Sequence, residues 1–168
     1  MHRLHDLSAA LVGAVLLGAT GLARVEGRAA IVVLVVAAAT VPLVLADVRE
    51  RRLPNALTVP ILLAGLASMV GGALAGQVSV ELPAALVTAL ALGVLRAAGG
   101  LGLGDVKLGT GLALPLAAVD PVIALLAPLL AFVLAGVWSL PSALRGGGER
   151  IPFGPFQLAG FWLVIAWV

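Results

Sequence analysis

The amino-acid sequence predicts an all-α protein, a bundle of about six to seven helices that cross a membrane. Hydrophobic residues make up 62% of the 168 residues and charged residues only 11%, whereas soluble proteins average roughly 45–50% and roughly 25%. A soluble chain this apolar has too few polar side chains to cover its surface. In addition, long apolar stretches recur along the chain, and the basic residues gather between alternate stretches.

Seven apolar segments follow from the length of about 20 residues that a helix needs to cross a hydrocarbon core about 30 Å thick. They are Leu7–Ala23, Ala29–Ala46, Ala56–Ala75, Leu82–Leu95, Val106–Val119, Val122–Leu140 and Phe153–Val168. The fourth and fifth segments are short, so one of them is expected to enter the membrane incompletely. The first segment is long for the apolar core of a signal peptide, and we interpret it as a retained anchor.

The basic residues predict how the bundle is oriented. If the seven segments alternate, the N-terminus and the loops near residues 47–55, 96–105 and 145–152 share one side of the membrane. That side carries Arg3, Arg49, Arg51, Arg52, Arg96, Lys107, Arg145 and Arg150, and the other side carries only Arg24 and Arg28. Because the side richer in Lys and Arg is normally cytoplasmic, we predict that it faces the cytoplasm.

Composition also excludes several kinds of catalytic group and partner. Cysteine is absent, and the two histidines, His2 and His5, lie at the extreme N-terminus. Thiolate nucleophiles and Ser–His or Cys–His sets are therefore excluded, and we predict no metal and no organic cofactor. The formal net charge is only +2 and no Lys/Arg run is interleaved with aromatic residues, so no nucleic-acid partner is predicted.

Three polar motifs carry the remaining chemistry, and the predicted topology places all three on the cytoplasmic side. They are Asp-Val-Arg-Glu-Arg-Arg-Leu-Pro-Asn at 47–55, Gly-Leu-Gly-Asp-Val-Lys-Leu at 102–108, and Arg-Ile-Pro-Phe-Gly-Pro-Phe at 150–156. A carboxylate at a membrane boundary is energetically costly, so each one there is a candidate for function.

Asp105 follows two glycines, Gly102 and Gly104, which have no Cβ and let the backbone bend and approach a substrate chain closely. The aspartate is expected to start a helix, where backbone N–H groups stabilise the ionised carboxylate. The alternative is an ordinary helix cap after a glycine-rich loop.

Asp47 is harder to explain as a structural residue, because it closes an apolar segment and lies at the unfavourable end of the helix dipole. A local salt bridge to Arg51 is the alternative, and such exposed pairs contribute little stability. Two aspartates near one another cannot both ionise easily, so one holds a proton while the other acts as a base on water.

The three motifs together resemble those of the type IV prepilin peptidases, the Gly-x-Gly-Asp group of membrane aspartyl proteases. The matching residues are Asp47, Arg49, Leu53, Pro54 and Asn55, then Gly102, Gly104, Asp105, Val106, Lys107 and Leu108, and finally Ile151 through Phe156. With no cysteine and only about 46 residues before Asp47, the chain is similar to a short peptidase-only form. Larger members of this family carry a methyltransferase region with paired Cys-x-x-Cys motifs, so the resemblance to the peptidase-only form implies that this chain does not methylate the cut pilin.

The resemblance implies an endopeptidase that removes a short basic leader from pilin-like precursors at the cytoplasmic face of the bacterial inner membrane. Its expected partners are type IV pilin, Flp-type pilin or pseudopilin precursors and the lipid bilayer. Asp47 and Asp105 carry over as the catalytic pair. We expect a single domain, with an extra N-terminal span and loop in residues 1–28 and the catalytic core in residues 29–168.

Supporting roles are expected for the other motif residues. Lys107 either tunes a carboxylate or holds the substrate backbone, or else anchors the helix at the interface. The three arginines Arg49, Arg51 and Arg52 either meet an acidic residue of the substrate or enforce topology, and topology is favoured for two of them. Asn55 is expected to hydrogen-bond near the site.

The last motif, with Pro152 and Gly154, suits a rigid loop that closes over the site or a helix entrance lodged in the interface. Two other classes of protein stay open from the residues alone: a small proton- or ion-coupled transporter subunit, and a non-catalytic assembly protein with the same fold.

Overall fold

The structure, a computed structural model, describes residues 2–77, 80–146 and 151–168. Within these residues it is an all-helical polytopic membrane bundle, as predicted. The helices are α1 (His2–Arg24), α2 (Gly27–Glu50), α3 (Asn55–Leu74), α4 (Glu81–Ala97), α5 (Leu103–Val119), α6 (Pro121–Leu144) and α7 (Gly154–Trp167).

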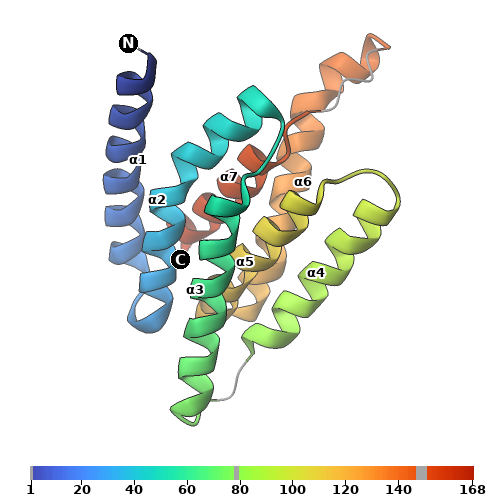
Figure 1. The fold of residues 1–168 in the computed structure, drawn as a ribbon. Helices are drawn as coiled ribbons and strands as arrows, with labels where there is room; N and C mark the ends of the chain where they lie inside the picture. Colours follow the sequence, from blue (N-terminus) through green and yellow to red (C-terminus); the bar gives the residue numbers. More distant parts are fainter. Residues whose placement is uncertain (1, 78–79, 147–150) are drawn as a thin grey trace.

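The helices run alternately up and down (Figure 1). The start of α1, the α2–α3 and α4–α5 connections and the start of α7 therefore lie toward one end of the bundle. Arg24 and Arg28 lie at the opposite end, where α1 ends and α2 begins. This alternation is the arrangement on which the predicted division of basic residues depends. Arg150 and the side chain of Arg3, two members of the richer set, fall outside the described residues.

Helix length separates the seven helices into two groups. Four of them, α1, α2, α3 and α6, are long and apolar enough to cross a membrane unaided. The other three are shorter: α4 and α5 have 17 residues each and α7 has 14. A helix of 17 residues is about 26 Å long, slightly less than the hydrocarbon core. The predicted shortness of the fourth and fifth segments is therefore confirmed.

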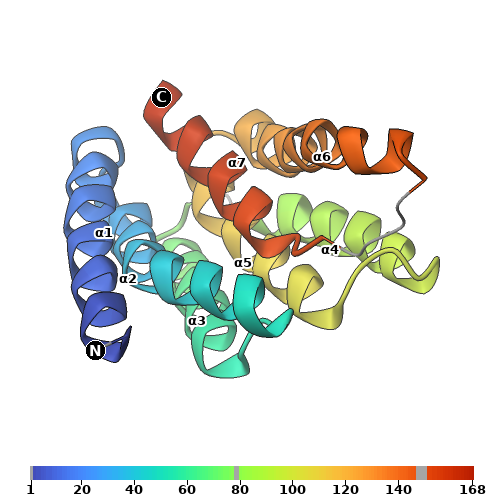
Figure 2. The same cartoon turned by 90° about the horizontal axis from the view of Figure 1, so that it is seen from above.

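The central helix is α5, which packs against α2, α3, α4, α6 and α7, as the view from above shows (Figure 2). Nine of its residues are buried, including an unbroken run over residues 111–117. By contrast, α1 lies at the edge of the bundle and packs mainly on α2. The helix that carries Asp105 in its first turn is thus the one that packs against the most neighbouring helices.

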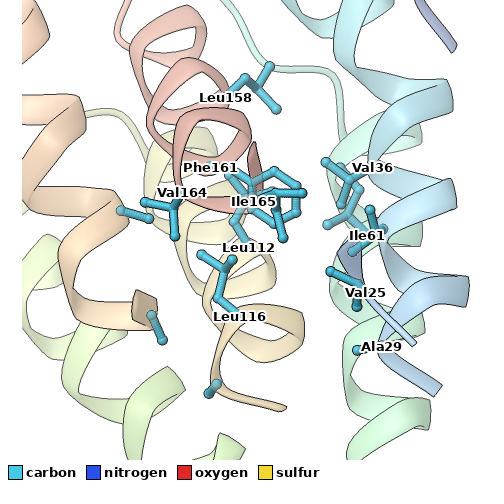
Figure 3. Packing of buried hydrophobic residues seen from close by; sticks show 14 of the residues in the cluster. Val25, Ala29, Val36, Ile61, Leu112, Leu116, Leu158, Phe161, Val164 and Ile165 are labelled. Atoms are coloured by element: carbon cyan, nitrogen blue, oxygen red, sulfur yellow. The ribbon is translucent and has the colours of Figure 1, made fainter. Parts of the chain in front are cut away.

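The core is built from side chains of several helices. Phe161 and Ile165 of α7 face Leu112 of α5, and Ile61 of α3 and Val36 of α2 line the other side (Figure 3). All five residues belong to one buried cluster.

Glycine allows the backbones to approach closely where these helices meet. A Cβ built on Gly160 would lie 2.5 Å from the Ala127 carbonyl oxygen of α6. One on Gly111 would lie 3.1 Å from Cγ2 of Ile61 and 3.3 Å from the Leu62 backbone nitrogen of α3. Since lipid provides no hydrophobic drive between helices, this close contact is what holds them together.

Candidate active site

Asp47 lies in the last turn of α2 and is only 5% exposed. Its Oδ2 accepts a hydrogen bond of 2.8 Å from the backbone N–H of Gly154, the first residue of α7. The predicted alternative of a salt bridge to Arg51 is wrong, because no ion pair joins the two among the described residues. Instead, Arg51 ends α2 in a left-handed conformation (φ +52°), with its N–H bonded to the Asp47 carbonyl.

Asp105 lies in the first turn of α5, which begins at Leu103 and not at the aspartate. Its Oδ2 turns back and accepts a 2.9 Å hydrogen bond from the backbone N–H of Gly102. Because Gly102 has no side chain, this is one half of a capping box. The capping interpretation is therefore confirmed, because the carboxyl group closes the first turn of α5 through this bond.

The charge of Asp47 acts on the carboxyl group of Asp105, although 58 positions separate the two residues in the sequence. Burial withdraws both from water. Neighbouring carboxylates that are partly removed from water resist double ionisation, so they favour the state in which the pair shares one proton. The structure thus brings together the two groups that the sequence selected.

Leu53 marks the point where the three motifs meet. It belongs to the first motif, and its Cβ would lie 2.8 Å from a Cβ built on Gly104 of the second. Its Cδ2 would lie 2.9 Å from a Cβ built on Gly154 of the third. The glycines at these two positions let α5 and α7 close on the same leucine beside the carboxyl groups.

The third motif forms the entrance of α7, with Pro152 in the half-buried segment just before it. Phe153 is 8% exposed, and its ring packs against Phe132 of α6 with centroids 4.7 Å apart. This packing fixes the chain immediately before Gly154, whose N–H then meets Asp47. The motif therefore leads into a helix, and its position in the membrane interface stays a prediction.

Lys107 and Asn55 form a second link between motifs. The Lys107 amine donates a 3.0 Å hydrogen bond to the Asn55 Oδ1 at the start of α3. This bond connects the first turns of α5 and α3 on the exposed side of the site.

Arg49 points away from the carboxyl pair. Its guanidinium makes two hydrogen bonds, of 2.6 and 2.8 Å, to the Asp6 carboxylate of α1. The structure therefore does not bring Arg49 together with Asp47, although both lie in the last turn of α2.

Gln157 is a residue of the site that sequence reasoning missed. It lies one turn into α7, is 4% exposed, and donates a 3.1 Å hydrogen bond from Nε2 to the backbone carbonyl of Asp105. A signal was present in the sequence, because it is the one amide side chain in an otherwise apolar segment. Polar side chains at such positions are costly and mark functional sites in membrane proteins.

No cluster of three or more His, Cys, Asp or Glu side chains suited to a metal ion occurs in the described parts of the chain. What the arrangement offers is a carboxyl pair, with Asp47 buried and Asp105 half-buried, in which each member accepts a hydrogen bond from a glycine N–H. Such a pair can hold and transfer a proton, as general acid–base chemistry on water requires. These features define a polytopic membrane protein with a pair of carboxyl groups at one end of its helical bundle.

Comparison with known families agrees with this class. The model of the type IV leader peptidase family matches residues 29–140, more than half of the chain. The protein belongs to this family, whose members are aspartic-type prepilin leader peptidases. The matched region contains both aspartates but stops before α7. No curated protein and no solved structure matches the chain significantly.

Proposed function

We propose that the protein is an aspartyl endopeptidase that removes the short basic leader from type IV prepilin-like precursors. It acts at the cytoplasmic face of the bacterial inner membrane, and Asp47 and Asp105 are its catalytic residues. The meeting of the three motifs at Leu53, which sets the buried Asp47 and its Gly154 contact beside the half-buried Asp105, supports the proposal. Family membership supports the substrate class, which includes type IV pilins, Flp-type pilins and pseudopilins.

The reaction needs only water and the two carboxyl groups. The ionised aspartate removes a proton from water as the oxygen attacks the scissile carbonyl carbon, while the protonated aspartate donates its proton to the carbonyl oxygen. The second aspartate, now ionised, takes a hydroxyl proton from the tetrahedral intermediate as the C–N bond breaks, and the first gives the leaving amine the proton that it removed from water. Each aspartate thus acts once as acid and once as base and returns to its starting state, which is why both are required.

The membrane face follows from charge. In the described residues, the basic side chains at the end of the bundle that holds the carboxyl pair include Arg49, Arg51 and Lys107. The positive-inside rule assigns that end to the cytoplasm. When the basic leader of a precursor lies at this end, the apolar segment that follows it lies in the bilayer. The junction between leader and apolar segment then lies at the membrane boundary, beside the carboxyl pair.

The test is leader cleavage of a co-expressed prepilin-like precursor in membranes of a host without its own leader peptidase. We expect wild type to cleave, and Asp47→Asn and Asp105→Asn each to lose roughly 10²–10⁴-fold in rate. Asp120→Asn is the matched control, because Asp120 caps α6 at the far end of the bundle and an amide oxygen retains that cap.

The outcomes separate the proposal from its alternatives. Cleavage that persists in either active-site variant would disprove the assignment of the pair. Failure of wild type to cleave any of the three precursor classes would contradict the peptidase function. Binding of a precursor without cleavage would then favour an assembly protein, and proton-coupled uptake in vesicles a transporter subunit.

A further inference from the structure

The first turn of α7 contacts both residues of the carboxyl pair. The Gly154 N–H donates a hydrogen bond to the side chain of Asp47. Three residues later, the Gln157 side-chain amide donates one to the backbone carbonyl of Asp105. A single rigid turn therefore touches α2 and α5 at the two points where their aspartates project. This turn lies beyond residues 29–140, the part of the chain that the family model matches.

Gln157 is a poor stabilising residue for the place that it occupies. Its Oε1 is buried and has no hydrogen-bond partner in the described parts of the chain. A hydrogen bond contributes about 0.5–1.5 kcal/mol net, whereas a buried polar atom without a partner costs about 1–3 kcal/mol. The amide thus gains little or no stability in sum, and its presence calls for another explanation.

The orientation of the amide follows from its partner. The Asp105 carbonyl is an acceptor only, so Nε2 and not Oε1 must face it. A carbonyl oxygen has two lone pairs, so this bond adds to the normal helical bond from the amide four residues on. The amide lies against α5 at Gly109, where a Cβ would make ordinary van der Waals contacts of 3.5 Å with Oε1 and 3.7 Å with Nε2.

The backbone that carries Asp105 needs such support. It enters α5 through Gly102 and Gly104, which have no side chains to fix the conformation of the turn. The Asp105 side chain itself holds Gly102, so any proton or substrate that competes for Oδ2 weakens that bond. The bond from Gln157 to the carbonyl is independent of the carboxyl group.

We propose that Gln157 is a positioning residue that fixes the backbone of Asp105 and thereby sets its carboxyl group against that of Asp47. The proposal rests on the proposed peptidase function of the pair. Gln157 does not touch substrate in this arrangement, because it is buried behind the first turn of α5. Its effect therefore falls on the chemical step and not on substrate binding.

The test is Gln157→Met, which keeps the length and volume of the side chain but removes the donor and the buried Oε1. We expect kcat for leader cleavage to fall by about tenfold to 10²-fold, because small displacements of a catalytic group cost this much. KM is expected to stay within about twofold and the thermal midpoint of unfolding to stay the same or rise. A merely structural role would lower the thermal midpoint together with the activity.

Gln77→Met is the matched control. Gln77 lies at the opposite end of the bundle, where its side chain accepts a hydrogen bond from Arg28. The same chemical change there is expected to leave kcat at the wild-type value. If Gln157→Met keeps the wild-type kcat while Asp47→Asn and Asp105→Asn are inactive, the peptidase function stands and the positioning role is overturned.

A second measurement does not depend on activity. In an α-helix the amides of residues 107–109 bond to the carbonyls of residues 103–105, so their hydrogen exchange reports on the turn that Gln157 holds. We expect faster exchange of these amides in Gln157→Met than in wild type, and no change in Gln77→Met. Unchanged exchange in Gln157→Met would overturn the positioning role even if the peptidase function itself failed.

Discussion

At the scale of single residues, Gly154 lies where a side chain has no room. A Cβ built on it would lie 2.8 Å from Asp47 Oδ2 and 2.9 Å from Leu53 Cδ2. In Gly154→Ala the carboxylate must move away from the N–H that it accepts, so leader cleavage is expected to fall at least about tenfold. The measurement is the cleavage rate per amount of folded protein in membranes.

Gly136→Ala is the control for this substitution, because nothing lies within 4 Å of a Cβ built at that exposed position of α6. The same change is expected to leave cleavage and yield unaltered there. Wild-type cleavage by Gly154→Ala would show that the bond to Asp47 is unimportant for the reaction.

The Lys107–Asn55 hydrogen bond makes a prediction about a pair of residues. If both act through this bond, Lys107→Met and Asn55→Leu each lower the cleavage rate a few-fold. The double variant then cleaves as fast as the less active of the two single variants. A double-mutant cycle of cleavage rates measures this coupling. Effects that multiply would mean that Lys107 and Asn55 act separately.

The sequence makes Asp47 and Asp105 candidates because each stands at the edge of an apolar segment where a charge is costly. It did not identify the partners of the side chains. The bond of Asp47 to residue 154 and that of Arg49 to Asp6 join positions 107 and 43 residues apart. Such contacts depend on how helices pack, which the local pattern of one chain does not specify.

At the scale of helices, the contact between α6 and α7 depends on Gly160. Its missing Cβ allows α7 to approach the Ala127 carbonyl and the Ala131 backbone nitrogen of α6. Gly160→Val is therefore expected to force the helices apart and to cost roughly 1–3 kcal/mol, the usual range for overpacking. The measurement is the thermal midpoint of the purified protein.

Gly71→Val serves as the comparison, since a Cβ at this exposed position of α3 has nothing within 4 Å. Its thermal midpoint is expected to match that of wild type. Equal midpoints for both variants would contradict the close packing of α6 on α7.

The helix ends show where hydropathy is informative and where it is not. All seven apolar segments are helices, but α2 continues from the predicted Ala46 to Glu50, and α5 begins at Leu103 and not at Val106. Charged residues at the end of a membrane helix still form backbone hydrogen bonds, and a glycine-rich turn can be a cap. A prediction based on apolar content includes neither the charged end of α2 nor the glycine-rich start of α5. Both aspartates lie in these two turns.

At the scale of the whole molecule, the alternation of helices predicts the side on which each connection lies. A phosphatase that is active only outside the cytoplasm is expected to be active when fused after Ala75 or Val168, and inactive after Ala98 or Gly146. The reverse pattern is expected for a fluorescent protein that folds only in the cytoplasm. Phosphatase activity after Ala98 would place the start of α5, and Asp105 with it, on the wrong side of the membrane.

The contact between Asp47 and Gly154 also determines when the site can form during synthesis. A ribosome must add 107 further residues after Asp47 before the N–H that this carboxylate accepts has been made. During synthesis both aspartates enter the membrane well ahead of α7, so under the proposed function the nascent chain stays inactive until its last helix inserts. A product truncated after α6 would carry the complete pair of acids and still lack peptidase activity.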